Sequence, residues 1–296
     1  MPFIGELSAL LTAVVWTGTA IAFSGAVARI GSVQLNIDRL ILATVFLSVT
    51  ILITGASFNV SAMQVTYLAV SGIIGLVIGD SFLFHAYKFI GPRYGMLLMS
   101  LAPAMTAIIA FFVLGEVISL LGFIGMAITI AGIALVVLEK QEVPVSKYKI
   151  DKLGIFWGVM AALGQAAGLI FAKFAFNLGE INGFVATFLR IFAAVVVFLP
   201  LTVIAGKYKN PVGIYKKDRR AFSLTVLGTI LGPYLGITCS LVAVAYTKVG
   251  IAATLMATTP IIMLPYSVFI HKEKLTWRSI LGTFLAVGGV AILFLH

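Results

Sequence analysis

Ten apolar runs, most of them close to the length that a helix needs to cross a bilayer, dominate this sequence. Crossing hydrocarbon takes about 20 apolar residues in a helix. Hydrophobic residues make up 61% of the chain and charged residues only 10%, against about 25% charged residues in a typical globular domain. We therefore predict an all-α, multi-pass protein of the cell membrane (plasma or inner). The ten expected transmembrane helices cover residues 4–28, 34–54, 63–87, 94–114, 118–138, 153–176, 183–205, 221–246, 249–270 and 276–295.

The formal charge of +10 comes from basic residues that flank these runs. Such residues fix orientation and contact anionic lipid, so we expect the lipid bilayer and not nucleic acid as the partner of the basic segments. The single cysteine and three scattered histidines give no metal site, and we expect no cofactor.

Sixteen of the twenty Lys and Arg residues lie in connectors on one face of the expected bundle, at 29–33, 88–93, 139–152, 206–220 and 271–278. The positive-inside rule would make this face cytoplasmic and would leave both termini outside.

The chain repeats itself. Pro103 matches Pro260, and Glu116 matches Glu273, at the same spacing of 157 residues. Arg39 and Arg190 are related by a similar spacing of 151. Further pairs at 157 are Gly125 with Gly282, Gly132 with Gly289, and Ser71, Gly75 and Gly79 with Gly228, Gly232 and Gly236. We therefore divide the chain into a first five-helix repeat at 1–138, a polar linker at 139–152 and a second repeat at 153–296.

Five helices per repeat is an odd number, so the second repeat is expected to cross the membrane in the opposite direction to the first. Two inverted repeats are an architecture of secondary transporters, which bind substrate at the repeat interface near the midplane. An intramembrane enzyme would need a nucleophile next to a base, and no such spacing occurs, so we expect no enzyme. Pro103 and Pro260 lie inside expected helices, where proline kinks the chain, so the kinks would match in both repeats.

Several motifs support a family assignment. "ALLTAVVWTGTAIAF", "SLAPAMTAIIAFFVLGE" and "GFIGMAITIAGIALVV" in the first repeat, and "ATTPIIMLPYSVFIHKE" and "LGTFLAVGGVAIL" in the second, resemble the EamA family of the drug/metabolite transporter superfamily. The resemblance covers nearly the whole chain. It implies ten helices, a cavity between the halves, and alternating-access transport of small metabolites, often amino acids. It also implies cytoplasmic termini, opposite to the charge bias. The sequence departs from the family pattern at Thr17, where glycine often follows tryptophan, and at Gln165, which occupies the tryptophan position of the second repeat.

Asp80 is the embedded charge that most needs an explanation. It lies about 10 Å from the expected helix end, and its short side chain cannot reach the interface, unlike that of Lys88. It must pair, take up a proton or face water. Its repeat counterpart is Ile237, so the acid occurs once. Two interpretations remain open: a coupling or substrate-binding acid, with protons as possible partners, and a structural pair with a basic residue such as Arg39 or Lys88.

The matched Arg39 and Arg190 are further charged candidates inside the membrane, for binding a carboxylate or for pairing between helices. Polar and aromatic residues within the spans are candidates for lining a substrate cavity: Trp16, His85, Tyr87, Ser100, Gln165, Tyr234, Thr258 and Thr259. Aromatic side chains with few polar groups suit small ligands.

The expected function is secondary transport of small metabolites, such as amino acids or related compounds, by a monomer or weak homo-oligomer. A carrier or flippase of nucleotide sugars or lipid-linked sugars is the main alternative, and it would need several cationic groups in the cavity. A channel would need a charged ring or a carbonyl filter.

Overall fold

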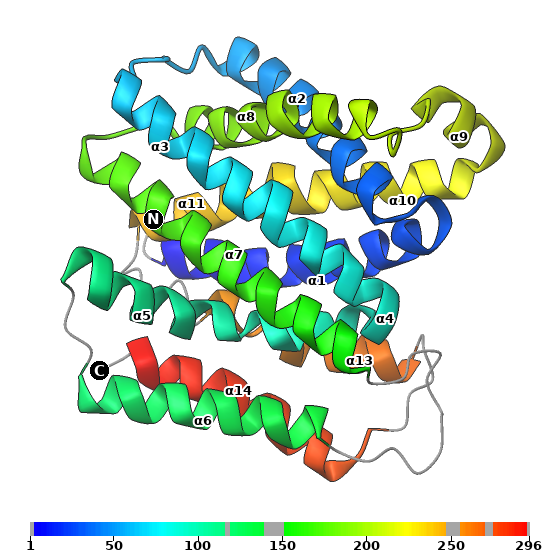
Figure 1. The fold of residues 1–296 in the computed structure, drawn as a ribbon. Helices are drawn as coiled ribbons and strands as arrows, with labels where there is room; N and C mark the ends of the chain where they lie inside the picture. Colours follow the sequence, from blue (N-terminus) through cyan, green and yellow to red (C-terminus); the bar gives the residue numbers. More distant parts are fainter. Residues whose placement is uncertain (1–2, 116–118, 139–150, 247–254, 270–274, 295–296) are drawn as a thin grey trace.

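The computed structural model describes residues 3–115, 119–138, 151–246, 255–269 and 275–294. Within these ranges the chain forms helices and no strand (Figure 1). Most of the predicted linker, and both Glu116 and Glu273, lie outside the described residues. The helices of the first half are α1 (Ile4–Ile30), α2 (Ser32–Thr54), α3 (Ala62–Gly72), the π-helix η1 (Ile73–Gly79), α4 (Asp80–Met99), α5 (Leu101–Leu114) and α6 (Leu120–Val137). Those of the second half are α7 (Lys152–Asn177), α8 (Gly183–Ile204), α9 (Pro211–Lys217), α10 (Arg219–Thr229), the π-helix η2 (Ile230–Gly236), α11 (Ile237–Tyr246), α13 (Thr259–Phe269) and α14 (Trp277–Phe294).

Seven helices in the described part are long and apolar enough to cross a membrane, and three shorter apolar helices accompany them. One of the seven, Ala62–Met99, has 38 residues, about twice what a bilayer requires. It is divided at Gly91, whose φ of 75° and ψ of 173° are not helical. Pro92 follows and cannot donate a helical hydrogen bond. The expected gap between the third and fourth spans, at 88–93, is therefore a sharp bend around Gly91.

The surface of the bundle is apolar. Leu52, Phe112, Leu120 and Ile204 are each at least 77% exposed, whereas Asp80 and Arg39 are buried inside. A water-soluble protein rarely leaves so much contiguous apolar surface uncovered. This distribution matches a protein whose outer surface is solvated by lipid chains.

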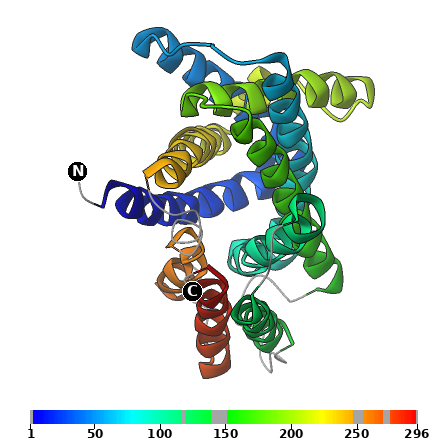
Figure 2. The ribbon, with the colours of Figure 1, turned by 90° about the vertical axis from the view of Figure 1, so that its left-hand side faces the viewer.

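The two halves contact each other in a reciprocal way. The segment α3–η1–α4 packs on α7, and the matching segment α10–η2–α11 packs on α1. Helix α2 packs on α8, and α6 lies side by side with α14 (Figures 1 and 2). Exchanging each helix for its repeat counterpart leaves this set of contacts unchanged.

Glycines make several of these contacts possible. A Cβ atom added to Gly132 would lie 2.4 Å from the backbone nitrogen of Ala286, and one added to Gly289 would lie 2.4 Å from that of Thr129. Gly132 and Gly289 are repeat counterparts, so the α6–α14 contact uses equivalent glycines on both sides. Small residues allow backbones to approach closely in lipid.

Candidate functional site

Asp80 begins α4 directly after the π-helix η1. The second π-helix, η2, lies 157 residues further on, the spacing of the repeat. Residues 73–79 and 230–236 thus adopt the same rare conformation in both halves. In a π-helix the hydrogen bond spans one residue more than in an α-helix, and such segments occur frequently at functional sites.

Close packing of glycines holds η1 against α7. A Cβ atom on Gly164 would lie 2.7 Å from the Cα atom of Gly79, and one on Gly168 would lie 3.1 Å from that of Gly75. Because the two backbones touch, side chains at the edge of this contact reach across the boundary between the halves. Gln165, which neighbours Gly164, is one of them.

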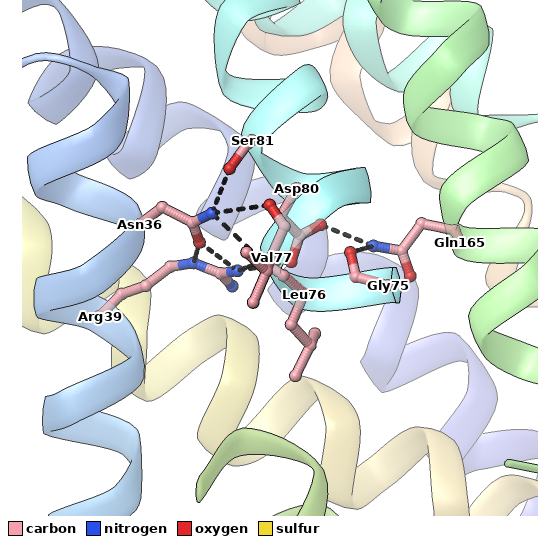
Figure 3. A network of polar contacts seen from close by, with 8 residues as sticks. All are labelled: Asn36, Arg39, Gly75, Leu76, Val77, Asp80, Ser81 and Gln165. Atoms are coloured by element: carbon pink, nitrogen blue, oxygen red, sulfur yellow. Dashed lines mark hydrogen bonds and ion pairs between the residues drawn. The ribbon is translucent and has the colours of Figure 1, made fainter. Parts of the chain in front are cut away.

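Asp80 forms an ion pair with Arg39 of α2. The Nη2 atom of Arg39 lies 2.5 Å from Oδ2 of Asp80, and the Nε2 atom of Gln165 donates to Oδ1 at 2.6 Å (Figure 3). Asp80 and Arg39 are only 7% and 4% exposed. Both carboxylate oxygens are therefore bound by donors from two different helices, one of them in the other half of the chain.

Asn36 orders the arginine. Its Oδ1 atom accepts from Nε and Nη2 of Arg39 at 2.9 and 2.7 Å, while its Nδ2 donates to the carbonyl of Leu76 at 3.2 Å and to Oγ of Ser81 at 2.9 Å (Figure 3). The guanidinium also lies 4.9 Å from the ring centroid of Phe84, within the range of a cation–π contact.

The π-helix supplies acceptors to the network as well. Its Gly75 carbonyl accepts from Nε2 of Gln165 at 3.2 Å, and its Leu76 carbonyl accepts from Asn36. The Gly75 carbonyl also accepts the backbone N–H of Asp80, five residues on. The irregular backbone therefore takes part in the polar site directly.

Arg190 lies on α8 beside this network. It is 8% exposed, and its Nε atom is buried without a hydrogen-bond partner. A Cβ atom added to Gly75 would lie 3.6 Å from Nη2 of Arg190 and 3.7 Å from Oε1 of Gln165. Both side chains therefore lie against the π-helix at Gly75. Arg190 also interacts electrostatically with Asp80.

Of the sequence-predicted residues, the network joins Asp80, Arg39 and Gln165, with Arg190 alongside. Lys88 is exposed and lies over the ring of Phe89, so the basic partner of Asp80 is Arg39. Asn36 and Ser81 were not predicted. A signal for Asn36 exists, because an amide inside an apolar helix needs a polar partner.

The other predicted cavity residues are dispersed. Trp16 packs against Gly236 on η2, and the Tyr87 hydroxyl donates to the sulfur of Met96 at 3.1 Å. Nδ1 of His85 lies 2.8 Å from the Ser81 carbonyl. Tyr234 lies in η2, and its hydroxyl is 2.9 Å from Oγ1 of Thr50. None of these contacts includes the Asp80 carboxylate.

Breaks in the helices lie just before the two matched prolines. A turn at Ser100 separates α4 from α5, whose third residue is Pro103; Oγ of Ser100 is buried without a partner. Residues 257–258 form the corresponding turn before α13, in which Pro260 is the second residue. The side chains of Thr258 and Thr259 donate to nearby backbone carbonyls within 2.8 Å. Both halves thus interrupt equivalent helices at equivalent points.

A second polar cluster joins the halves near the start of α2. Asp38 accepts hydrogen bonds from Tyr215 at 2.6 Å, Tyr208 at 2.9 Å and Gln34 at 3.1 Å. Burial, followed by the negative charge of Asp38, raises the pKa of Tyr208; burial and the hydrogen bond to Asp38 raise the pKa of Tyr215.

Nearby, the exposed Arg29 pairs with Asp218 at 2.7 Å. The backbone N–H of Ala221, and then Arg29, lower the pKa of Asp218. Among the described residues no group of three or more His, Cys, Asp or Glu side chains could hold a metal ion.

Fold and site together define an integral membrane protein of two related helical halves that share a buried charged network. The model of the EamA-like transporter family matches residues 3–138 and 152–295. The chain belongs to this family, and it is a membrane transporter of the drug/metabolite transporter superfamily. The family consists of transporters and not of enzymes.

A comparison with curated proteins finds no match. One solved crystal structure, which carries no description beyond the word "protein", is similar to this chain. The match covers 98% of this chain and 96% of that one, with 17% sequence identity and a TM-score of 0.67. At this identity the likeness shows the fold alone.

Proposed function

We propose that the protein is a secondary transporter that moves small metabolites, such as amino acids or related compounds, across the cell membrane by alternating access. The observation that carries this proposal is the buried network around Asp80. It contains an ion pair inside membrane-spanning helices and is completed by Gln165 from the other half. Embedded ion pairs at such a boundary commonly mark substrate or ion pathways.

The proposal includes ten spans in two inverted halves. The seven long apolar helices and the three shorter ones add up to ten. The reciprocal contacts between the halves, and the π-helices at equivalent positions, support a two-fold relation between them. With five spans per half, the halves would cross the membrane in opposite directions, and rocking one against the other would expose the site to each side in turn.

Asp80 is the proposed coupling group. A proton on its carboxylate would remove the charge that holds Arg39 and would weaken the acceptor for Gln165. Since Gln165 belongs to the second half, protonation would loosen a contact between the halves. The helix breaks before Pro103 and Pro260 are the proposed hinges of this movement.

The number of available cations favours small metabolites over sugar nucleotides. Arg39 is engaged by Asp80 and Asn36. Among the described residues of this site, Arg190 is therefore the cation that remains available to bind a substrate. A pyrophosphate group carries more negative charge than one guanidinium balances.

Uptake into proteoliposomes by purified protein tests the proposal. Labelled amino acids, organic cations, nucleotide sugars and lipid-linked sugars would be offered with and without an imposed pH gradient. We expect saturable uptake of an amino acid or a related small metabolite. Uptake of nucleotide or lipid-linked sugars alone would contradict the substrate class, and flux that does not saturate would indicate a channel.

A further inference from the structure

The second half of the protein contains an incomplete copy of the Asp80 network. Arg190 is the repeat counterpart of Arg39, and Thr187 is the counterpart of Asn36, both at a spacing of 151 residues. The counterpart of Asp80, at 157 residues, is Ile237. The first half thus supplies its arginine with a carboxylate, and the second half has an aliphatic side chain at the equivalent position.

The donors of this incomplete copy are buried without acceptors. Oγ1 of Thr187 and Nε of Arg190 are both buried and have no hydrogen-bond partner. Arg190 forms no ion pair with any residue that the structure describes. The two residues are three apart on α8 and therefore lie on one helix face. Most buried polar groups in proteins are hydrogen-bonded, so two unpartnered groups on one face indicate a site for an external acceptor.

The charges of the site are also unbalanced. Two guanidinium groups, of Arg39 and Arg190, lie near one carboxylate, that of Asp80, which leaves a net charge of +1 within the described network. An uncompensated charge is costly where water is scarce. A bound group with a single negative charge would neutralise it, whereas a phosphate dianion would exceed it.

We propose that Arg190 and Thr187 bind the carboxylate of the transported molecule, the acidic group that the second half lacks among its own side chains at position 237. The planar guanidinium matches a carboxylate in two parallel hydrogen bonds, and the Thr187 hydroxyl can donate a third. Gln165, which lies against Gly75 together with Arg190, connects this subsite to Asp80. This inference rests on the proposed transport function and names the group by which that site recognises its substrate.

Thermal unfolding of the purified full chain tests the subsite without requiring transport. The probes are acetate, benzoate and L-leucine, each paired with its amide (acetamide, benzamide and L-leucinamide), together with inorganic phosphate, all at matched ionic strength. We expect at least one carboxylate, but not its amide, to raise the unfolding temperature. Loss of one partner of a buried charge pair commonly costs 2–5 kcal/mol, so Arg190→Gln is expected to weaken binding by roughly 30-fold or more.

Two further variants make the result specific. Arg278→Gln removes an exposed arginine on α14 and is expected to leave the shift unchanged. Thr187→Val keeps the shape of the side chain and is expected to weaken carboxylate binding even if Arg190→Gln does not fold. The inference is overturned if no acid stabilises more than its amide, if phosphate alone stabilises, or if the shift survives in both Arg190→Gln and Thr187→Val.

Counterflow in proteoliposomes separates this inference from the proposed function. Carboxylate binding that depends on Arg190, without any flux, would refute transport and leave the subsite standing. Saturable flux of a substrate whose binding is indifferent to Arg190 would refute the subsite and leave transport standing.

Discussion

The ion pair between Arg39 and Asp80 should couple the stability of two helices that are distant in sequence. The perturbation is a double-mutant cycle of Arg39→Met, Asp80→Leu and the combined variant. These replacements remove the charges while roughly retaining side-chain volume. Each single variant leaves one buried charge without its ion-pair partner. Arg39 then keeps its bonds to Asn36 and to the Leu76 carbonyl, and Asp80 keeps the bond from Gln165 and the nearby Arg190.

The structure sets the expected size of this effect. At an effective dielectric constant near 20, two unit charges about 4 Å apart interact by about 4 kcal/mol. Removing one partner of a buried pair typically costs about 3–5 kcal/mol, and the remaining amide contacts place each single variant near the lower end, at about 3 kcal/mol. The double variant should cost less than the sum, because neither Arg39 nor Asp80 is left without its partner, whereas Arg190 loses Asp80 equally in Asp80→Leu and in the double variant. We expect a coupling energy of about 2–3 kcal/mol.

Reversible unfolding in mixed detergent micelles measures all four free energies. The exposed pair of Arg29 and Asp218, with nearly the same separation of 2.7 Å, is the matched control, and its coupling should be much weaker than that of the buried pair because solvent screens it. Additivity of the two buried substitutions to within about 0.5 kcal/mol would refute the claim that this pair holds the site together.

Three other predictions follow from particular contacts. Thr187→Val, which removes a buried hydroxyl without a partner, should raise the free energy of unfolding by about 1 kcal/mol, and a loss of stability would contradict this. Gly289→Ala should lower the free energy of unfolding by about 1–3 kcal/mol, because the added Cβ atom would clash with the backbone of α6. The adjacent Gly288→Ala, whose Cβ atom would enter open space, should be neutral or stabilising. Equal effects of the two variants in denaturant titrations would count against the α6–α14 contact. Folding raises the pKa values of Tyr208 and Tyr215, so as pH rises the unfolded chain loses these protons before the folded chain does. The free energy of unfolding should therefore fall as pH rises above about 10. Replacing both tyrosines with Phe should flatten this alkaline slope, and an unchanged slope in pH-dependent melting would show that other groups cause it.

The helical architecture could be predicted from the sequence because it depends on local pattern. Each apolar run of the required length corresponds to one or more helices in the described residues. The breaks at Gly91 and Ser100 lie one and three residues before prolines, which disfavour a continuous helix. The repeat spacing of 157 also relates η1 to η2, although the π-helical conformation itself could not be inferred. The glycines of both π-helices approach the facing helices closely, and no local pattern contains those contacts.

The candidate site was predictable only in part, for the same reason. A buried Asp80 requires a partner, and Arg39 is one of the two basic residues that the sequence offers for it. The choice of Arg39 over Lys88 depends on the rotation of α2 and α4 against each other. Asn36 was missed because its role appears only when Arg39 is already in place.

The cluster around Asp38 could not be predicted from the sequence. Its partners Tyr208 and Tyr215 lie about 170 residues away, in a connector whose lysines indicate lipid contact. They meet only because residues 208–215 fold back against α2.

The central claim, that Asp80 couples transport to a proton, is tested most directly by comparing two modes of flux in proteoliposomes containing Asp80→Asn. Asparagine can still accept from Arg39 and occupy the same space, but it cannot take up a proton. We predict that substrate counterflow persists, whereas accumulation driven by a pH gradient is lost. Accumulation equal to that of the wild type would contradict the proposed role of Asp80.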